Sequence, residues 1–273
     1  MKKIFIILIF IIVNMLTNRS FLYSQNTDIS KTLSEIFEEA QKYERQDNLE
    51  KALELYQKVF ENSKEISWKK DALMAIAELY QKQKRYKESL ETYKKYLELS
   101  STPFEISKGK TGIAHVYISQ GEYYKGLKTL DEIIEEYPKT EIAAMAQLLK
   151  ADIYADKIKD YESAIKEYEK IIEEYPDSWM VKTPFALEKI AYCYVKLKKY
   201  DEAIAIYEKI INDYSNTPFE KVAKLNIEFI NEYEKKDRPV PPEVIIKRMK
   251  EIGLGKGIIN VEIKDGKIIT NVK

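Results

Sequence analysis

Residues 185–214 read FALEKIAYCYVKLKKYDEAIAIYEKIINDY, and this stretch contains the pattern that decides the fold. Ala191 lies three residues before Tyr194, and Ala203 lies four residues before Tyr207. Spacings of three and four residues place side chains on one stripe of a helix. The segment between the two stripes is short and rich in lysine, which suits a tight polar turn. The stretch therefore predicts two helices that pack against each other in opposite directions.

The alanine–tyrosine mark occurs five times along the chain, so the helix pair is an internal repeat. Successive marks lie 37, 37, 37 and 40 residues apart: Ala40/Tyr43, Ala77/Tyr80, Ala114/Tyr117, Ala151/Tyr154 and Ala191/Tyr194. After each mark, a small residue is followed four places later by a large one: Ala52/Tyr56, Ser89/Tyr93, Gly126/Leu130, Ala164/Tyr168 and Ala203/Tyr207. Small residues let two helices cross closely, and the large residue one turn away fills the adjoining groove. We therefore expect five antiparallel helical hairpins.

Proline positions predict where helices end and begin. Tyr137-Pro138 and Tyr175-Pro176 are expected to end a helix, because proline cannot continue one. Threonine is expected as the N-cap and proline as the first helical residue at 102–103, 183–184 and 217–218. In the fourth repeat, the turn near residues 157–159 has one extra residue.

These features together resemble the tetratricopeptide repeat, in which small-x-x-Tyr is followed by aromatic-x-x-small-x-x-x-Tyr and then by proline. The resemblance covers residues 33 to about 219, with a period of 37 rather than 34 residues and no tryptophan at the start of the first helix. It implies an all-α, TPR-like superhelical solenoid of antiparallel helix pairs that binds a protein or peptide without catalysis. The linkers EEYPKT (135–140) and EEYPDS (173–178) are similar to those of bacterial envelope members, namely Tol-Pal-associated periplasmic proteins and outer-membrane assembly lipoproteins.

The N-terminus has the pattern of a signal peptide over residues 1–24. Lys2 and Lys3 precede an unbroken apolar run over residues 4–13, which is shorter than the 20 or so residues of a bilayer-spanning helix. Retention of this segment as a membrane anchor remains an alternative. Lipidation would need a cysteine just after the run, and the only cysteine is Cys193. We therefore expect an exported, periplasmic protein that is not a lipoprotein and that lies near a membrane.

The chain divides on these grounds into a signal peptide (1–24), a solenoid of five repeats plus a capping helix (25–236) and a tail (237–273). The capping helix is expected over residues 219–233, since an end repeat must cover the apolar face of its neighbour.

The tail is expected to contain a proline-rich linker, a helix over about 242–251 closed by Gly253, and a β-hairpin of 258–263 with 267–272 around Asp265-Gly266. A lone hairpin is marginal in water, so it must lie against something. Two interpretations stay open. The hairpin packs on its own chain, or its edge pairs with a partner or a second copy.

The composition argues against several classes of function. Three of the 45 basic residues and none of the 45 acidic ones lie in residues 1–24, so the mature chain carries a formal charge of about −3. A balanced chain without an Arg/Lys-rich run is not expected to bind nucleic acid.

Catalytic and cofactor motifs are also missing. His115 is the only histidine, which excludes His-dependent triads and paired-histidine metal sites. Cys193 lies between two tyrosines on a packed helix, where a small buried hydrophobe is expected. Gly253, Gly255 and Gly257 lack the context of a phosphate loop. We expect no enzymatic activity, no cofactor and no metal.

The helical period predicts which residues face a partner. At about 100° per residue, the side of each first helix opposite the Ala/Tyr seam lies three residues before and one, four and five residues after the marker alanine. In the resembled family this side lines a concave groove. The positions are Phe37, Gln41, Glu44 and Arg45; Met74, Glu78, Gln81 and Lys82; Thr111, His115, Ile118 and Ser119; Leu148, Asp152, Ala155 and Asp156; and Glu188, Tyr192, Val195 and Lys196. Only three of these residues are basic and none is asparagine, so a family-type clamp for a peptide's terminal carboxylate is not expected.

Four of these positions form an apolar stretch suited to an amphipathic helix or an extended segment: Ile118, Leu148, Tyr192 and Val195. The alternative is that they contact the capping helix or the tail. His115 is expected to be an ordinary groove or surface residue rather than a pH sensor.

Three functional hypotheses follow. The first is a non-catalytic adaptor that binds a protein or peptide partner in the cell envelope, in its assembly or maintenance. The second is a structural, self-assembling envelope protein, and the third is an accessory subunit of an envelope enzyme. The oligomeric state stays open.

Overall fold

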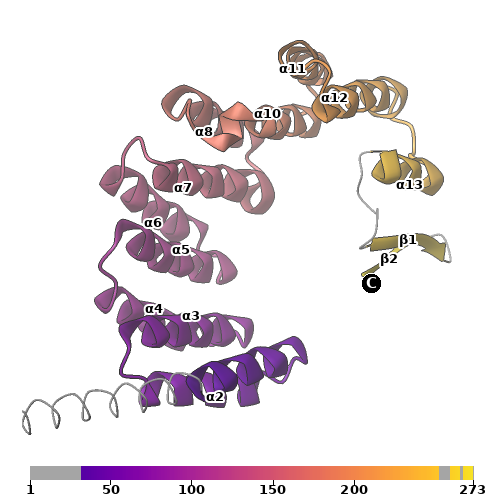
Figure 1. The fold of residues 1–273 in the computed structure, drawn as a ribbon. Helices are drawn as coiled ribbons and strands as arrows, with labels where there is room; N and C mark the ends of the chain where they lie inside the picture. The colour runs from indigo at the N-terminus through magenta and orange to yellow at the C-terminus, as the bar shows by residue number, and fades with distance from the viewer. Residues whose placement is uncertain (1–31, 252–258, 265–266, 273) are drawn as a thin grey trace, which may run out of the picture. The chain divides into compact units, whose positions relative to one another are not determined.

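The computed structural model describes residues 32–251, 259–264 and 267–272, which fall into two compact units (Figure 1). Unit 1 spans Met1–Thr129 and unit 2 spans Leu130–Lys273. The boundary falls within helix α6 (Tyr123–Glu136). The expected signal peptide lies outside the described residues. Among the described residues, no helix is both long enough and apolar enough to cross a bilayer.

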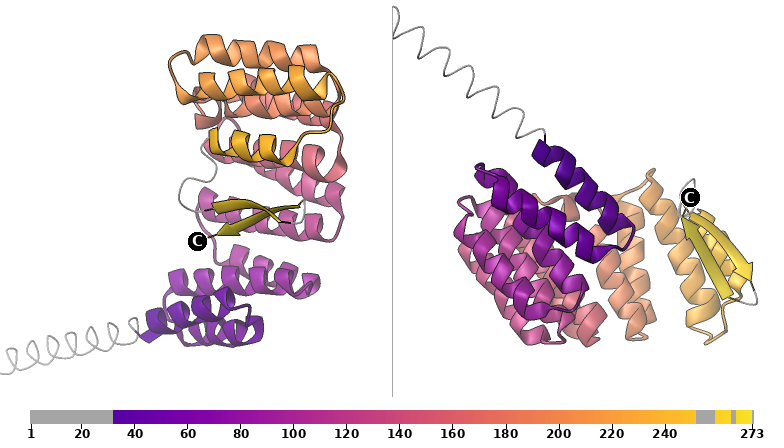
Figure 2. Two further views of the ribbon diagram at one scale, coloured as in Figure 1. Left: turned by 90° about the vertical axis from the view of Figure 1, so that its right-hand side faces the viewer. Right: turned by 90° about the horizontal axis from the view of Figure 1, so that it is seen from below.

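Unit 1 consists of helices joined pairwise by short turns, which makes neighbours antiparallel. Its helices are residues 32–45, α2 (Leu49–Asn62), α3 (Ile66–Lys82), α4 (Tyr86–Glu98), α5 (Pro103–Ser119) and the first turns of α6. Figure 2 shows the pairing from two further sides.

Unit 2 continues the same pairing and ends in a short tail. Its helices are the last turns of α6, α7 (Glu141–Asp152) with the π-helical turn η1 (Ile153–Ile158), α8 (Tyr161–Glu174), α9 (Trp179–Lys182), α10 (Phe185–Lys196), α11 (Tyr200–Asp213), α12 (Pro218–Phe229) with the π-helical turn η2 (Ile230–Glu234), and α13 (Pro242–Glu251). Strands β1 (Ile259–Lys264) and β2 (Lys267–Val272) pair antiparallel, with Ile259 opposite Val272 and Lys264 opposite Lys267. The expected turn at Asp265-Gly266 and the helix stop at Gly253 lie outside the described residues. The expected all-α class of TPR-like helix pairs is confirmed.

The five marker alanines are fully buried, as the repeat predicts: Ala40, Ala77, Ala114, Ala151 and Ala191 are each 0% exposed. The small residues of the second helices allow close crossings in unit 1. Ser89 Oγ donates a hydrogen bond to the carbonyl oxygen of Ala77 at 2.7 Å. A Cβ added to Gly126 would lie 3.2 Å from the carbonyl oxygen of Ala114. Larger side chains at these positions would force the two helices of a repeat apart.

The proline signals are confirmed in part. Helix α6 ends before Tyr137-Pro138 and α8 ends before Tyr175-Pro176. Thr102 caps α5 and forms a reciprocal capping box with Glu105. The expectation for Thr183-Pro184 is wrong, because Pro184 is the N-cap of α10 and Thr183 Oγ1 donates to the carbonyl oxygen of Trp179 at 2.9 Å. Thr183 therefore closes α9 instead of opening α10.

Two irregularities interrupt the repeat in unit 2. The extra residue of the fourth repeat is taken up by η1, where Asp160 N–H donates to the carbonyl oxygen of Tyr154 at 2.9 Å. Such single π-helical turns are the usual way for a helix to absorb one inserted residue. The longer interval before the fifth mark is filled by the short helix α9.

One backbone motif recurs at the turns within helix pairs. A residue in the left-handed region ends the first helix in six turns: Asp47, Lys84, Gly121, Lys159, Lys198 and Asp237. At Lys159 the bond runs from Asp160 to Tyr154, six residues back. In the other five turns the next N–H donates to the carbonyl oxygen of the tyrosine five residues back, as from Arg85 to Tyr80 at 2.8 Å and from Arg238 to Tyr233 at 3.0 Å. This is the 6→1 bond of the Schellman motif. The turn after η2 therefore has the geometry of the turns inside the five repeats.

Replacing Lys84 with glycine is expected to stabilise the protein by about 0.5–1 kcal/mol. Lys84 has φ 59°, a conformation that costs an L-residue with a Cβ roughly 1–2 kcal/mol, whereas glycine loses more backbone entropy on folding. Urea unfolding of the full chain measures the difference. The matched control is Lys94→Gly, at an exposed position inside α4, which is expected to lose about 1 kcal/mol. Equal loss in both variants would contradict the argument.

Candidate protein-binding faces

The predicted binding positions lie on the first helix of each pair, and we call this side the first-helix face of each unit. In unit 1 it is polar, and its side chains bind one another. Lys82 forms an ion pair with Glu44 of the preceding repeat. Gln81 Nε2 donates to Ser119 Oγ at 2.7 Å and to the carbonyl oxygen of His115 at 3.2 Å. Four of the predicted side chains are therefore already engaged between repeats: Glu44, Gln81, Lys82 and Ser119.

Other predicted positions of unit 1 differ in exposure. Gln41 and Arg45 are exposed, and Thr111 is half-buried. Glu78 is exposed and forms no ion pair with another described residue. Desolvation and then the charge of Glu44 raise the pKa of Glu78. Desolvation lowers the pKa of the His115 imidazole, so its neutral form is favoured.

Two apolar positions of unit 1 belong to its core. Met74 is 7% exposed. The ring of Phe37 packs edge-on against Tyr56, with centroids 4.9 Å apart, and against Trp68 at 5.6 Å. Both residues therefore contribute to packing inside unit 1 rather than to an exposed binding face.

In unit 2, Asp152 holds three helices together. Its Oδ1 accepts a hydrogen bond from the Tyr168 hydroxyl at 2.5 Å and contacts Lys189 Nζ at 2.8 Å. These groups come from α7, α8 and α10. Tyr168 is 1% exposed, and desolvation followed by the bond to Asp152 raises its pKa. Asp152 lies on the predicted face but serves the packing of the repeats.

Tyr192 is the prominent exposed group on the first-helix face of unit 2. Its side chain is 39% exposed, and Lys196 Nζ lies 5.3 Å from the ring centroid. Asp156 is exposed and Glu188 is half-buried, and neither forms an ion pair with another described residue. Burial raises the pKa of the Glu188 carboxyl. This face thus combines one accessible aromatic ring with carboxylates that are free to bind a partner.

The expected apolar stretch is reduced to this tyrosine. Leu148 and Val195 are half-buried and pack against the cores of unit 2. Ile118 belongs to unit 1, where its side chain lies beside Gly126 of α6. Ala155, on η1, is 2% exposed.

Several exposed apolar side chains were not predicted. They are Ile66, Phe104, Tyr124, Met145, Trp179 and Phe219. Tyr124 is 75% exposed, and the other five are between 36% and 69% exposed. Phe104 and Phe219 each follow a Thr-Pro helix start, and the sequence Thr-Pro-Phe also occurs at 183–185. The ring of Phe185 packs against Trp179 at a tilt of 54°, with ring centroids 5.0 Å apart. The recurring Thr-Pro-Phe in the sequence could therefore have indicated that an aromatic side chain lies at the start of several helices.

The described part of the chain shows no metal-holding cluster and no reactive thiol. There, no group of three His, Cys, Asp or Glu residues could hold a metal ion. Cys193 is fully buried, and burial raises the pKa of its thiol to about 12. A thiol with such a pKa stays protonated at neutral pH and is a poor nucleophile.

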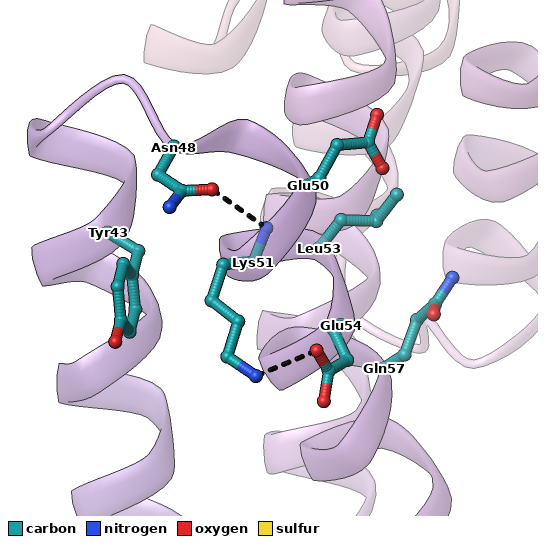
Figure 3. Close-up of a pocket in the computed structure, with 7 residues that line it drawn as sticks. All are labelled: Tyr43, Asn48, Glu50, Lys51, Leu53, Glu54 and Gln57. Atoms are coloured by element: carbon teal, nitrogen blue, oxygen red, sulfur yellow. Dashed lines mark hydrogen bonds and ion pairs between the residues drawn. The ribbon is translucent and has the colours of Figure 1, made fainter.

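A shallow hollow of about 640 Å³ lies on unit 1 (Figure 3). It is lined by Tyr43, Asn48, Glu50, Lys51, Leu53, Glu54 and Gln57. Figure 3 shows Tyr43 on one helix facing the side chains of α2 on the other. Lys51 Nζ binds Glu54 Oε2 at 2.8 Å, and Asn48 Oδ1 accepts from the backbone N–H of Lys51 at 3.3 Å. These polar groups satisfy one another, so the hollow offers no nucleophile with a base beside it.

A smaller pocket of about 140 Å³ lies in unit 2, where α8, α9, α10 and α11 meet. Its floor is apolar, and Lys209 and Asp213 of α11 line it as well.

Comparisons with protein families identify the repeats. Family models described as tetratricopeptide repeat match residues 71–103, 145–178 and 185–217. These segments begin and end close to the helix pairs seen in each unit. No curated protein matches the chain.

Solved structures with a similar fold include the apo form of RapI, with a TM-score of 0.53 and 17% identity over 80% of this chain and 82% of that one. A Rap protein complexed with Competence and Sporulation Factor has a TM-score of 0.50 and 16% identity over 80% of this chain and 64% of that one. A thermophilic TPR protein of Thermus thermophilus has a TM-score of 0.43 and 17% identity over 70% of this chain and 97% of that one. At such identities the first two likenesses support the fold alone.

Proposed function

We propose that this chain, which contains tetratricopeptide repeats, is a non-catalytic adaptor that binds a protein or peptide partner. Stacked helix pairs of this kind build extended binding surfaces. A Rap protein with a similar fold was solved in complex with Competence and Sporulation Factor, which supports binding as the role of the fold.

The observation that carries the proposal is the exposed Tyr192 on the first-helix face of unit 2. Tyrosine is enriched among the residues that dominate binding energy at interfaces. Lys196 covers part of the ring, while Asp156 and Glu188 leave their carboxylates free. Unit 1 has no exposed tyrosine on its first-helix face, since its apolar positions Phe37 and Met74 belong to the core and Lys82 is paired with Glu44. The partner is therefore proposed to bind unit 2 around Tyr192.

Crosslinking in intact cells tests this assignment. A photoreactive residue at position 192 is expected to capture one partner protein. The same residue at position 124 is expected to capture none, although Tyr124 is more exposed, at 75%. Replacing Asp156 with lysine and Tyr192 with alanine is expected to weaken capture at least tenfold, because burial of one large side chain contributes about 1.5–3 kcal/mol.

Asp152 is kept in that variant, because its change would disturb the packing of unit 2. Unchanged capture by the folded Asp156→Lys, Tyr192→Ala variant, or equal capture from position 124, would refute the proposal that the partner binds the first-helix face of unit 2. Self-crosslinks as the sole product would instead favour a self-assembling protein.

We propose that the adaptor is exported and works in the periplasm, in envelope assembly or maintenance. The N-terminal pattern of two lysines, an apolar run and a polar break supports export. Mass spectrometry of the protein purified from its own cells is expected to show a chain that begins at Gln25. A chain that retains residues 1–24 and fractionates with membranes would favour an N-terminal anchor instead.

We also propose that the tail from residue 237 packs as a helix and hairpin on its own chain. Arg248 supports the packing of helix α13, because its guanidinium carbon lies 4.0 Å from the ring centroid of Phe229 and its side chain donates to Asn226 Oδ1. Hydrogen exchange of residues 259–272 as fast as that of an unfolded peptide would contradict a stable hairpin.

A further inference from the structure

We propose that Glu188 and Tyr207 of unit 2 form a binding site for a lysine side chain of the partner protein. The ammonium group of this lysine donates to the carboxylate of Glu188 and to the hydroxyl oxygen of Tyr207. This proposal rests on the proposed function, because Glu188 lies one helical turn before Tyr192 on the first-helix face of unit 2. It adds the chemistry of the partner, which presents a lysine beside the group that contacts Tyr192.

Two other repeats contain a complete set of three side chains that bind one another. The carboxylate lies on the first helix of the repeat, the tyrosine on its second helix and the lysine on the first helix of the next repeat. The sets are Glu44, Tyr56 and Lys82 in unit 1, and Asp152, Tyr168 and Lys189 in unit 2. In each set the tyrosine hydroxyl and the lysine ammonium both contact the carboxylate. The chain therefore uses lysine as the cation for this pairing of a tyrosine with a carboxylate.

The fifth repeat has the carboxylate and the tyrosine of such a set without the lysine. Glu188 lies on α10, and Tyr207 lies on α11 at the repeat position of Tyr168. The next first helix is α12, where Lys224 pairs with Glu220 at 2.5 Å. No ion pair joins Glu188 to another residue in the described part of the chain. A lysine from a partner would complete the set.

Both polar groups of the site are withdrawn from water. Tyr207 is only 7% exposed, and its hydroxyl has no hydrogen-bond partner among the described residues. Burial, followed by the charge of Glu188, raises the pKa of Tyr207 to about 12, so the two side chains lie close together. Burial also raises the pKa of the Glu188 carboxyl, and no charge of the described residues offsets this effect. A buried polar group without a partner costs free energy that a bound donor recovers.

The chemistry of the two groups selects an ammonium group. A carboxylate accepts hydrogen bonds, and a protonated phenol can also accept one through its oxygen. Lysine offers three N–H donors and a positive charge at the end of a flexible stem, so one ammonium group can bind both. A calcium ion would need about six to eight oxygen ligands. The described part of the chain has no cluster of three His, Cys, Asp or Glu residues that could hold such an ion.

Arg248 of α13 does not take the place of this lysine. Its positive charge acts on Tyr207 after burial and Glu188, but its guanidinium is engaged elsewhere. The guanidinium lies over the ring of Phe229 and donates to Asn226 Oδ1. The carboxylate of Glu188 is therefore left for a cation of the partner.

Selection of random peptides displayed on phage against the full chain tests the site. Enriched peptides are expected to share a lysine whose replacement by methionine weakens binding at least tenfold, or about 1.4 kcal/mol. Glu188→Lys is expected to select an acidic residue in place of this lysine. The matched control, Glu208→Lys, changes the charge of an exposed carboxylate on α11 and is expected to select the same lysine.

Two milder variants keep the test decisive if Glu188→Lys does not fold. Glu188→Gln and Tyr207→Phe are expected to bind the selected peptide about tenfold and about threefold more weakly, respectively. Tyr207→Phe is expected to unfold at the same urea concentration as the parent, because the hydroxyl that it removes binds no described residue. Weaker peptide binding without a change in the unfolding midpoint separates a binding role from a structural one.

Enrichment of no peptide, or of peptides without a shared lysine, would overturn the lysine site. An equal loss of lysine-containing peptides with Glu188→Lys and Glu208→Lys would also overturn it, because the attraction would then be unspecific. Peptides that need Tyr192 but keep full affinity for Glu188→Gln would overturn this site and leave the first-helix face of unit 2 supported. Peptides that need neither Tyr192 nor Glu188 would overturn both proposals.

Discussion

Replacing Gly112 with alanine is expected to destabilise unit 1 by about 2–3 kcal/mol, although alanine is the better helix former by about 1 kcal/mol. Gly112 lies in α5, where an added Cβ would come within 2.3 Å of Cε1 and 2.4 Å of Cζ of Tyr93. Carbon atoms in favourable contact are about 3.5–4.0 Å apart. Tyr93 is only 2% exposed, so its ring cannot turn into solvent and α5 must move away from α4.

Urea unfolding can follow each unit separately, because Trp68 lies in unit 1 and Trp179 lies in unit 2. In a Trp179→Phe background the fluorescence reports on unit 1. Gly121→Ala is the matched control, since a Cβ there meets nothing within 4 Å and only the φ of +79° opposes alanine. The control is expected to cost about 1 kcal/mol. A Gly112→Ala variant as stable as the parent would show that the crossing of α4 and α5 is not close-packed.

The fold was predictable because packing constraints recur at every repeat. Each marker alanine had to be small for the same reason, and five coinciding positions outweigh the ambiguity of any single one. Thr183-Pro184 failed as a helix start because the local pattern is the same as at Thr102-Pro103. The difference is the inserted helix α9, which places the Thr183 hydroxyl next to the carbonyl of Trp179. That contact depends on tertiary packing and not on the dipeptide.

The binding face was predictable only as a set of positions. The helical period places Glu44, Lys82 and Asp152 on the first-helix faces, but it does not say which side chains bind each other. Those contacts join residues about one repeat apart, as in the ion pairs Glu44–Lys82 and Asp152–Lys189. In the sequence, two opposite charges separated by about one repeat could have indicated these contacts. They mark residues that stabilise the stack and leave fewer groups for a partner.

Removal of the Asp152 carboxylate is expected to destabilise unit 2 by about 2–3 kcal/mol. The Asp152→Ala variant leaves the hydroxyl of Tyr168, which is 1% exposed, without its acceptor. An unsatisfied buried donor costs about 1–3 kcal/mol. Lys189 also loses its ion pair, but its side chain is 32% exposed and can turn toward water. Most of the expected loss therefore comes from the tyrosine hydroxyl.

A double-mutant cycle with Tyr168→Phe separates the two contributions, with unfolding of unit 2 followed through Trp179 in a Trp68→Phe background. In the presence of Tyr168→Phe, Asp152→Ala is expected to cost at least 1 kcal/mol less, because no hydroxyl is then left unsatisfied. Asp156→Ala, at an exposed position in the following turn, is the control and is expected to change stability by less than about 0.5 kcal/mol. Equal losses with and without the Tyr168 hydroxyl would show that Asp152 does not serve as its acceptor. Asp152 would then return to the residues available to a partner, and its charge reversal would belong in the crosslinking test beside Asp156 and Tyr192.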